Sequence, residues 1–94
     1  MSANSYRACT GDTAVVSGKA VLDSISIAPL TATPTAGLLT IYDSTSESGT
    51  VVYKEWVFAT TVGHTIDLDV LCRTGIYVGY DASLANVGVT VAYS

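Results

Sequence analysis

The sequence predicts an all-β fold, a single antiparallel β-sandwich of jelly-roll-like character with roughly seven to eight strands. Three observations support this prediction. Apolar and polar residues alternate along several short segments rich in Val, Ile, Thr and Tyr. No longer stretch has apolar residues at helical spacing, and polar or glycine-containing turns separate the alternating segments. The 94 residues of the chain suffice for one domain with a modest core.

The beginning of the chain differs from the rest. The apolar residues of segment 1–12 show no period, whereas those of segment 13–94 do. We therefore expect an extended N-terminal arm over residues 1–12 and the β-sandwich domain over residues 13–94.

The first strand expected in the domain covers residues 21–27, where Leu22 is out of phase with Ile25. A β-bulge near Asp23 would bring Leu22 and Ile25 to the same side of the strand. Two prolines bracket the next segment, residues 29–34, and exclude a central strand there.

A polar hairpin loop follows. Residues 43–49 contain no apolar residue and end in glycine, which predicts the tip of a hairpin between a strand ending at Tyr42 and one beginning at Val51. The second of these strands has apolar residues on both faces: Val51, Tyr53 and Val57 on one, and Val52, Trp56 and Phe58 on the other. We expect one face to meet the core. The other would meet a neighbouring subunit, the chain's own arm or its loops.

Three more strands are expected after this hairpin. The clearest covers residues 64–72, where apolar and polar residues alternate as in an antiparallel strand with one face in solvent. Similar alternation predicts a shorter strand at residues 76–80, after a turn at residues 73–75, and a final strand at residues 87–93.

The composition argues against several classes of function. Eight acidic and four basic residues give a formal charge of −4, and no basic residues cluster, so we expect no nucleic-acid partner. No apolar run approaches the ~20 residues of a membrane helix, so we expect a soluble protein with no membrane partner. Cys9 and Cys72 do not have the spacing of a redox or zinc pair. We expect two separate buried thiols, with one disulfide between them as the alternative.

Few side chains could carry catalysis, so we expect no enzyme, no catalytic residue, no cofactor and no metal site. The single histidine, His64, begins a strand and is expected to be hydrogen-bonded at the edge of the core. Asp67 and Asp69 share one strand face about 7 Å apart. Two solvated carboxylates are expected there, and a cation site is the alternative.

Six tyrosines and one tryptophan also permit a lectin-like module, because aromatic rings stack on sugars. Its candidate residues are Trp56, Tyr53, Tyr42 and Tyr77, although Trp56 and Tyr53 lie on opposite faces of one strand. An interaction protein fits the small core, the strand with two apolar faces and the nearly uncharged Ser/Thr surface better. The residues expected at subunit contacts are Tyr6, Tyr53, Trp56 and Phe58.

Four segments carry a resemblance: Val16–Ile27, Gly37–Val52, Gly75–Val78 and Val87–Ser94. The most particular element is Gly-x-x-x-Ile-Tyr-Asp at residues 37–43, followed by a Ser/Thr loop and Gly-Thr-Val. In this order the segments resemble small all-β virion structural proteins of tailed bacteriophages, over the chain from about residue 13 to its end.

The resemblance implies a scaffold without catalytic residues. We favour a capsid decoration (cement) protein that binds the outside of the head shell and stabilises contacts between major capsid protein subunits. It would be made in the host cytoplasm and located on the capsid surface of the virion. Its expected partners are the major capsid protein or another virion protein and copies of itself, with a trimer favoured by the threefold axes of the shell. The alternatives are a tail or head-fibre subunit and a lectin-like carbohydrate-binding module.

Overall fold

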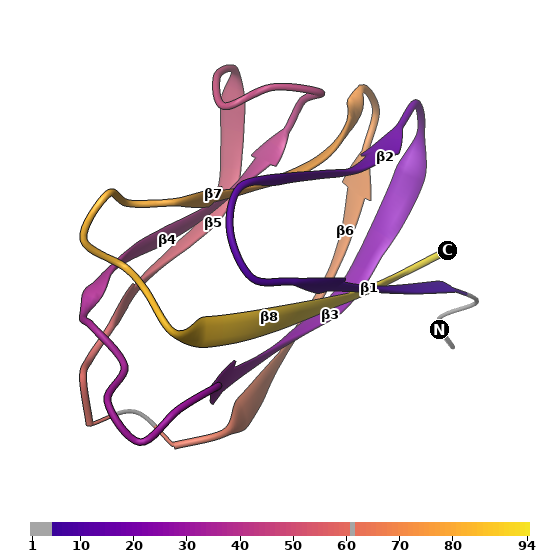
Figure 1. Cartoon of the computed structure of the whole chain (residues 1–94). Coiled ribbons are helices and arrows are strands. Elements are labelled where there is room, and N and C mark those ends of the chain that lie inside the picture. The colour runs from indigo at the N-terminus through magenta and orange to yellow at the C-terminus, as the bar shows by residue number, and fades with distance from the viewer. Residues whose placement is uncertain (1–4, 61) are drawn as a thin grey trace.

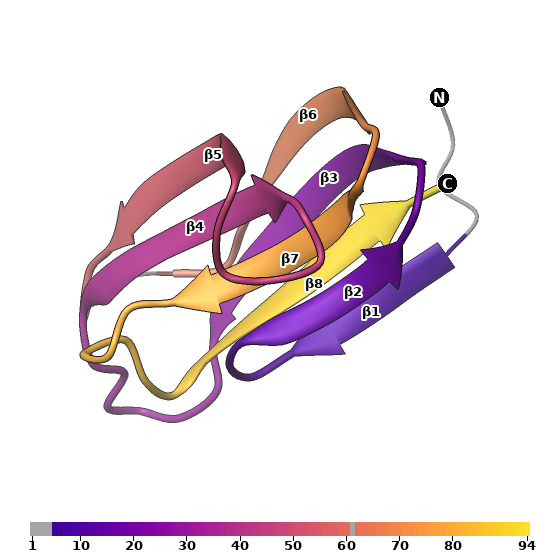
Figure 2. The same ribbon diagram turned by 90° about the horizontal axis from the view of Figure 1, so that it is seen from above.

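The computed structural model describes residues 5–60 and 62–94, and the regular elements among them are all β-strands. The strands are β1 (Ser5–Cys9), β2 (Thr13–Ser17), β3 (Ala20–Pro29), β4 (Gly37–Asp43), β5 (Thr50–Val57), β6 (His64–Cys72), β7 (Gly75–Tyr80) and β8 (Val87–Tyr93). They form two antiparallel sheets of four strands, which lie one above the other as a β-sandwich (Figure 1 and Figure 2). The predicted all-β sandwich is confirmed.

The strands form nested pairs around the β4–β5 hairpin. β4 pairs with β5, β3 with β6, β2 with β7 and β1 with β8, all antiparallel. Two further pairings join these pairs into two sheets: β3 also pairs with β8, and β4 also pairs with β7. Sheet A has the order β1-β8-β3-β6, and sheet B has the order β2-β7-β4-β5. Figure 2 shows the edge strands β1 and β2 at one side of the sandwich and the edge strands β5 and β6 at the other.

The described part of the predicted N-terminal arm is instead part of sheet A. Ser5–Cys9 forms the edge strand β1, which pairs with β8 along its whole length. The side chain of Cys9 is buried in the core. Residues 1–4 of the predicted arm lie outside the described residues.

The predicted bulge in the first strand of the domain is confirmed. The register of β3 shifts between Leu22 and Ser24 against both of its neighbours, β6 and β8. Leu22 and Ile25 are therefore both fully buried. Asp23 lies at this bulge and is itself buried, and neither of its carboxylate oxygens has a hydrogen-bond partner among the described residues.

One apolar core lies between the sheets. Its largest fully buried side chains are Leu22, Ile25, Ile27, Leu39, Ile41, Val57, Ile76, Val78, Val87, Val89 and Val91. Tyr80 of β7 is also buried, and its hydroxyl donates to the carbonyl oxygens of Val87 (2.8 Å) and Cys9 (3.2 Å). Because Tyr80 belongs to sheet B and its two acceptors belong to sheet A, this hydroxyl links the sheets near their β1–β2 side.

A second polar contact organises the opposite end of the strands. The Asp43 carboxylate, at the end of β4, accepts backbone N–H groups of Arg73 (3.1 Å), Thr74 (2.8 Å) and Gly75 (3.3 Å) in the β6–β7 turn. The hydrogen bond from Thr74, followed by that from Arg73, lowers the pKa of Asp43 below its usual value. The turn predicted at residues 73–75 is therefore held by a side chain from another hairpin.

Both cysteines are free and buried, as the interpretation of two separate thiols predicted. Cys9 and Cys72 lie on β1 and β6, the opposite edges of sheet A. Three strand spacings of about 4.8 Å separate these two strands by about 14 Å, and the register places Cys9 level with His64, at the opposite end of β6 from Cys72. The two cysteines are therefore more than twice as far apart as the Cα separation of roughly 7 Å that a disulfide can span. The alternative of one bridge within the chain is therefore excluded.

Replacing Tyr80 by phenylalanine tests the link between the sheets. Tyr80→Phe removes a buried donor and leaves two buried carbonyl oxygens without it, so we expect the free energy of unfolding to fall by about 1–2 kcal/mol. Urea denaturation measures this change. Tyr6→Phe, at a tyrosine that is 69% exposed, is the matched control and should leave stability unchanged. Equal effects of the two substitutions would contradict the role assigned to the Tyr80 hydroxyl.

The unpartnered Asp23 carboxylate gives a prediction of the opposite sign. A buried polar group without a hydrogen bond weakens the folded state, so Asp23→Ala is expected to raise the free energy of unfolding by about 1 kcal/mol. Thermal and urea denaturation at neutral pH would show the increase. A loss of stability would mean that the carboxylate supports the bulge in a way that its surroundings do not reveal.

Candidate functional site

The predicted contact residues do not all come together. Trp56 and Phe58 lie at the end of β5 on the β5–β6 side of the sandwich, whereas Tyr6 lies on β1 at the other side. Tyr53 is on β5 too, but its register partner is the buried Ile41, so it faces inward. The structure therefore joins two of the four predicted residues, separates Tyr6 from them by the width of a sheet and directs Tyr53 to the opposite face.

Trp56 and Phe58 form an exposed aromatic pair. Their ring centroids are 6.5 Å apart and their planes are 74° from parallel, an edge-to-face arrangement. Trp56 is 48% exposed and Phe58 is 63% exposed. Trp56 lies opposite Leu38 of β4, and both project from the outer face of sheet B. Large aromatic side chains exposed together at a sheet edge are typical of a protein contact surface.

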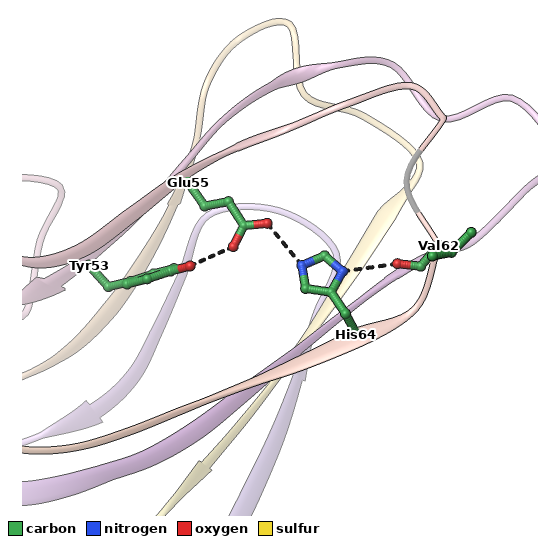
Figure 3. Close-up of polar contacts among 4 residues, drawn as sticks. All are labelled: Tyr53, Glu55, Val62 and His64. Atoms are coloured by element: carbon green, nitrogen blue, oxygen red, sulfur yellow. Dashed lines mark hydrogen bonds and ion pairs between the residues drawn. The ribbon is translucent and has the colours of Figure 1, made fainter.

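A chain of hydrogen bonds lies on the inner face of the same strand (Figure 3). The Tyr53 hydroxyl donates to Oε1 of Glu55 at 2.5 Å, and Oε2 of Glu55 lies 2.9 Å from Nε2 of His64. The other ring nitrogen of His64, Nδ1, lies 2.9 Å from the carbonyl oxygen of Val62. Glu55 belongs to β5 and His64 to β6, so this chain connects the two sheets at their β5–β6 side.

The surroundings of His64 favour its charged form. The Val62 carbonyl, followed by the Glu55 carboxylate, raises the pKa of His64 above its usual value, against a smaller opposing effect of burial. Burial, with the hydrogen bond to Glu55, raises the pKa of Tyr53 to about 12. Tyr53 therefore remains a hydrogen-bond donor at any ordinary pH. Both nitrogens of His64 are engaged, so neither is free to act as a base on a substrate.

His64 is the hydrogen-bonded histidine at the edge of the core that its position in the sequence predicted. Glu55 was not among the residues predicted from the sequence. A usable signal was present, since Tyr53 and Glu55 are two residues apart and must share a strand face. The contact with His64, however, forms only because the β5 edge of sheet B lies next to the β6 edge of sheet A. The alternation of side chains along a strand does not reveal that arrangement.

The other predicted polar residues remain at the surface. Asp67 and Asp69 are both exposed on β6 and alternate with half-buried apolar residues, as predicted. Within residues 5–60 and 62–94, no group of three or more His, Cys, Asp or Glu side chains could hold a metal ion. The surface of these residues also has no pocket. Among the described residues, no third His, Cys, Asp or Glu side chain joins Asp67 and Asp69 as the cation alternative would require.

The four lectin candidates do not form one platform. Tyr42 and Tyr77 are neighbours, with ring centroids 6.2 Å apart at 62°, but Tyr53 faces inward and Trp56 pairs with Phe58. The β4–β5 loop curls over β7 (Figure 2). A Cβ built on Gly79 would lie 3.1 Å from Cε1 of Tyr42 and 3.4 Å from Cγ of Glu47, so these two side chains lie over Gly79.

Carboxylates gather around this tyrosine pair. A hydrogen bond with Asp12, followed by the negative charge of Asp12, raises the pKa of Glu47. Asp12 is held in turn, because its Oδ1 accepts the backbone N–H of Tyr80 at 2.7 Å. The outer face of sheet B thus has two separate surface features: the aromatic pair near β5 and an acidic tyrosine cluster over β7.

No protein-family model matches the sequence, and no curated protein matches it significantly. Among the described residues, no helix is long and apolar enough to cross a membrane.

The exposure of the aromatic pair can be measured directly, because Trp56 is the only tryptophan in the chain. We expect acrylamide to quench its fluorescence readily in the native protein, with an emission maximum close to that of the urea-unfolded chain. Phe58→Ala removes the ring beside Trp56 and should increase quenching further. Native fluorescence that is blue-shifted and protected from acrylamide would show that Trp56 is covered in solution.

Proposed function

We propose that this chain is a structural component of a bacteriophage particle, a capsid decoration (cement) protein that binds the outside of the head shell. The observation that carries the proposal is the exposed aromatic pair at the β5 edge of a small sandwich. The resemblance of the sequence to small virion proteins supplies the class of particle. Trp and Phe side chains exposed in pairs are the kind of anchors on which protein interfaces depend.

The strand order supports a jelly-roll-like sandwich. A jelly roll forms when a long antiparallel hairpin folds over itself and its nested strand pairs are shared between two sheets. The four nested pairs of this chain are shared in this way between sheets of orders β1-β8-β3-β6 and β2-β7-β4-β5. Jelly rolls are common in viral capsid proteins, and the jelly-roll assignment thereby fits the proposed role. It does not by itself specify that role, because the same fold serves many functions.

The proposed action is mechanical. A decoration protein that bridges neighbouring major capsid protein subunits adds buried area at each junction and raises the free energy needed to separate them. An interface of about 1,600 Å² can be weak or tight depending on its anchor residues. Trimers placed at threefold positions of the shell would repeat each weak contact and so strengthen the attachment.

The main test is binding to phage head shells that lack the protein. Trp56→Ser and Phe58→Ser should each weaken cosedimentation with these shells by about 2 kcal/mol, or roughly 30-fold, because they remove the central anchors. Leu71→Ser is the matched control, since Leu71 is 42% exposed on β6 of the other sheet. Unchanged binding by both aromatic variants, with the same urea stability as the parent protein, would exclude the aromatic pair as the contact.

The same assay distinguishes a decoration protein from a tail or head-fibre subunit. Binding to tails or fibres but not to head shells would indicate a tail or head-fibre subunit. Such a result would retain the structural class and change the partner.

A lectin-like module is the second candidate, and one observation favours it. Tyr42 and Tyr77 form an edge-to-face pair beside Glu47, and carboxylates next to aromatic rings can bind sugar hydroxyls. Screening the isolated protein against a glycan array tests this alternative. Glycan binding that is lost in Tyr77→Ala and kept in Trp56→Ser would assign function to the cluster over β7.

A further inference from the structure

Glu55 and His64 form an ion pair that joins sheet edges sharing no backbone hydrogen bonds. Nε2 of His64 and Oε2 of Glu55 are 2.9 Å apart. Glu55 lies on β5 of sheet B and His64 is the first residue of β6 in sheet A. Separating these side chains would therefore loosen the β5–β6 side of the sandwich.

The geometry of this contact requires a doubly protonated ring. Nδ1 faces the carbonyl oxygen of Val62 and Nε2 faces the carboxylate of Glu55, and neither oxygen can donate a proton. A neutral imidazole has one N–H group, so one of its nitrogens would direct a lone pair at an oxygen. Loss of a proton from His64 thus turns one of two favourable contacts into a repulsive one.

The groups around His64 leave Glu55 as its counterion. From β5, Glu55 and Tyr53 face the ring, and the Tyr53 hydroxyl holds the second oxygen of Glu55. On β3 the register partner of His64 is Ile27, which has no charge. Asp67 and Asp69 are on the same strand but are exposed on its outer face.

We propose that Tyr53, Glu55 and His64 form a pH-dependent latch that holds the β5–β6 side of the sandwich closed while His64 is protonated and releases it when His64 loses its proton. The latch belongs to the folded chain itself and does not depend on what the protein binds. Tyr53 contributes by orienting Glu55, so it is a positioning residue.

The direction of the pH effect follows from the raised pKa of His64. Its contribution to stability is fully present below the usual histidine value of 6.5 and is lost as pH rises through the higher value of the folded state. Tyr53, with a pKa of about 12, stays protonated across this range. The latch is therefore closed under mildly acidic conditions and opens toward alkaline pH.

The single histidine makes the first measurement simple, because the chain has one histidine Cε1 proton to follow in an NMR titration. We expect a midpoint above 6.5 in the parent protein and a lower midpoint in Glu55→Gln, where the Val62 carbonyl remains but the carboxylate is lost. The control, Glu47→Gln, removes a carboxylate over β7 and should leave the midpoint unchanged. A parent midpoint at or below 6.5, or one that Glu55→Gln does not lower, would overturn the proposal.

Amide hydrogen exchange tests the opening itself. Protection of β5 and β6 amides, taken relative to amides of β8, should fall between pH 6 and pH 9. The relative protection is expected to fall about tenfold for each pH unit by which the titration midpoint of His64 in the closed protein exceeds its midpoint in the opened chain. His64→Gln can still donate to Glu55 and has no titration, so its relative protection should not change with pH. An equal loss of protection in the parent protein and His64→Gln would exclude the latch.

Discussion

The inner faces of the two sheets meet in one apolar layer, and each strand must keep its large apolar side chains on that side. The effect of this requirement is visible in β3, which lies between β8 and β6. Regular alternation from Leu22 to Ile25 would place one of them in solvent, and the bulge at Asp23 prevents this. The bulge also buries the Asp23 carboxylate without a partner, a local defect that accompanies the correct packing of two large core residues.

The apolar layer does not cover the two sides of the sandwich, where each edge strand has a hydrogen-bonded neighbour on one side only. Each side has a polar side-chain contact that connects the sheets. On the β1–β2 side, Tyr80 donates to backbone carbonyls of β1 and β8. On the β5–β6 side, Tyr53 bonds Glu55, which bonds His64. The first link contains no group that titrates near neutral pH, whereas the second contains the single histidine, so the two sides respond differently to pH.

The sequence was sufficient to predict the features that depend on neighbouring residues. Alternation along residues 64–72 matches the exposed and half-buried pattern of β6, and the phase error at Leu22 predicted the bulge. Two strands were missed, β1 and β2, for a physical reason. In β1 only Cys9 is fully buried, so no apolar period is visible, and its partner β8 lies at the other end of the chain. Such long-range pairing is decided by the whole sheet and not by local sequence.

The site was partly predictable for the same reason. Strand parity placed Trp56 and Phe58 on one face of β5 and Tyr53 on the other, and the structure agrees. The faces predicted for Val51 and Val52 were wrong, because a register shift opposite Ile41 and Tyr42 packs Val52 against the core and leaves Val51 exposed. Tyr6 could not be positioned, because that requires the order of strands in the sheet. The latch was missed because Glu55 and His64 belong to different sheets, and only the packing of one sheet on the other brings them together.

The position of β5 connects the two features of the site. Glu55 and Trp56 are consecutive residues, so one side chain faces the latch while the next faces solvent beside Phe58. β5 is hydrogen-bonded to β4 alone, and β4 cannot by itself fix how far the edge of sheet B stands from sheet A. The ion pair to His64 supplies that second constraint from across the sandwich. A displacement of β5 that breaks the ion pair must also move the aromatic pair, because both are carried by the same short length of backbone.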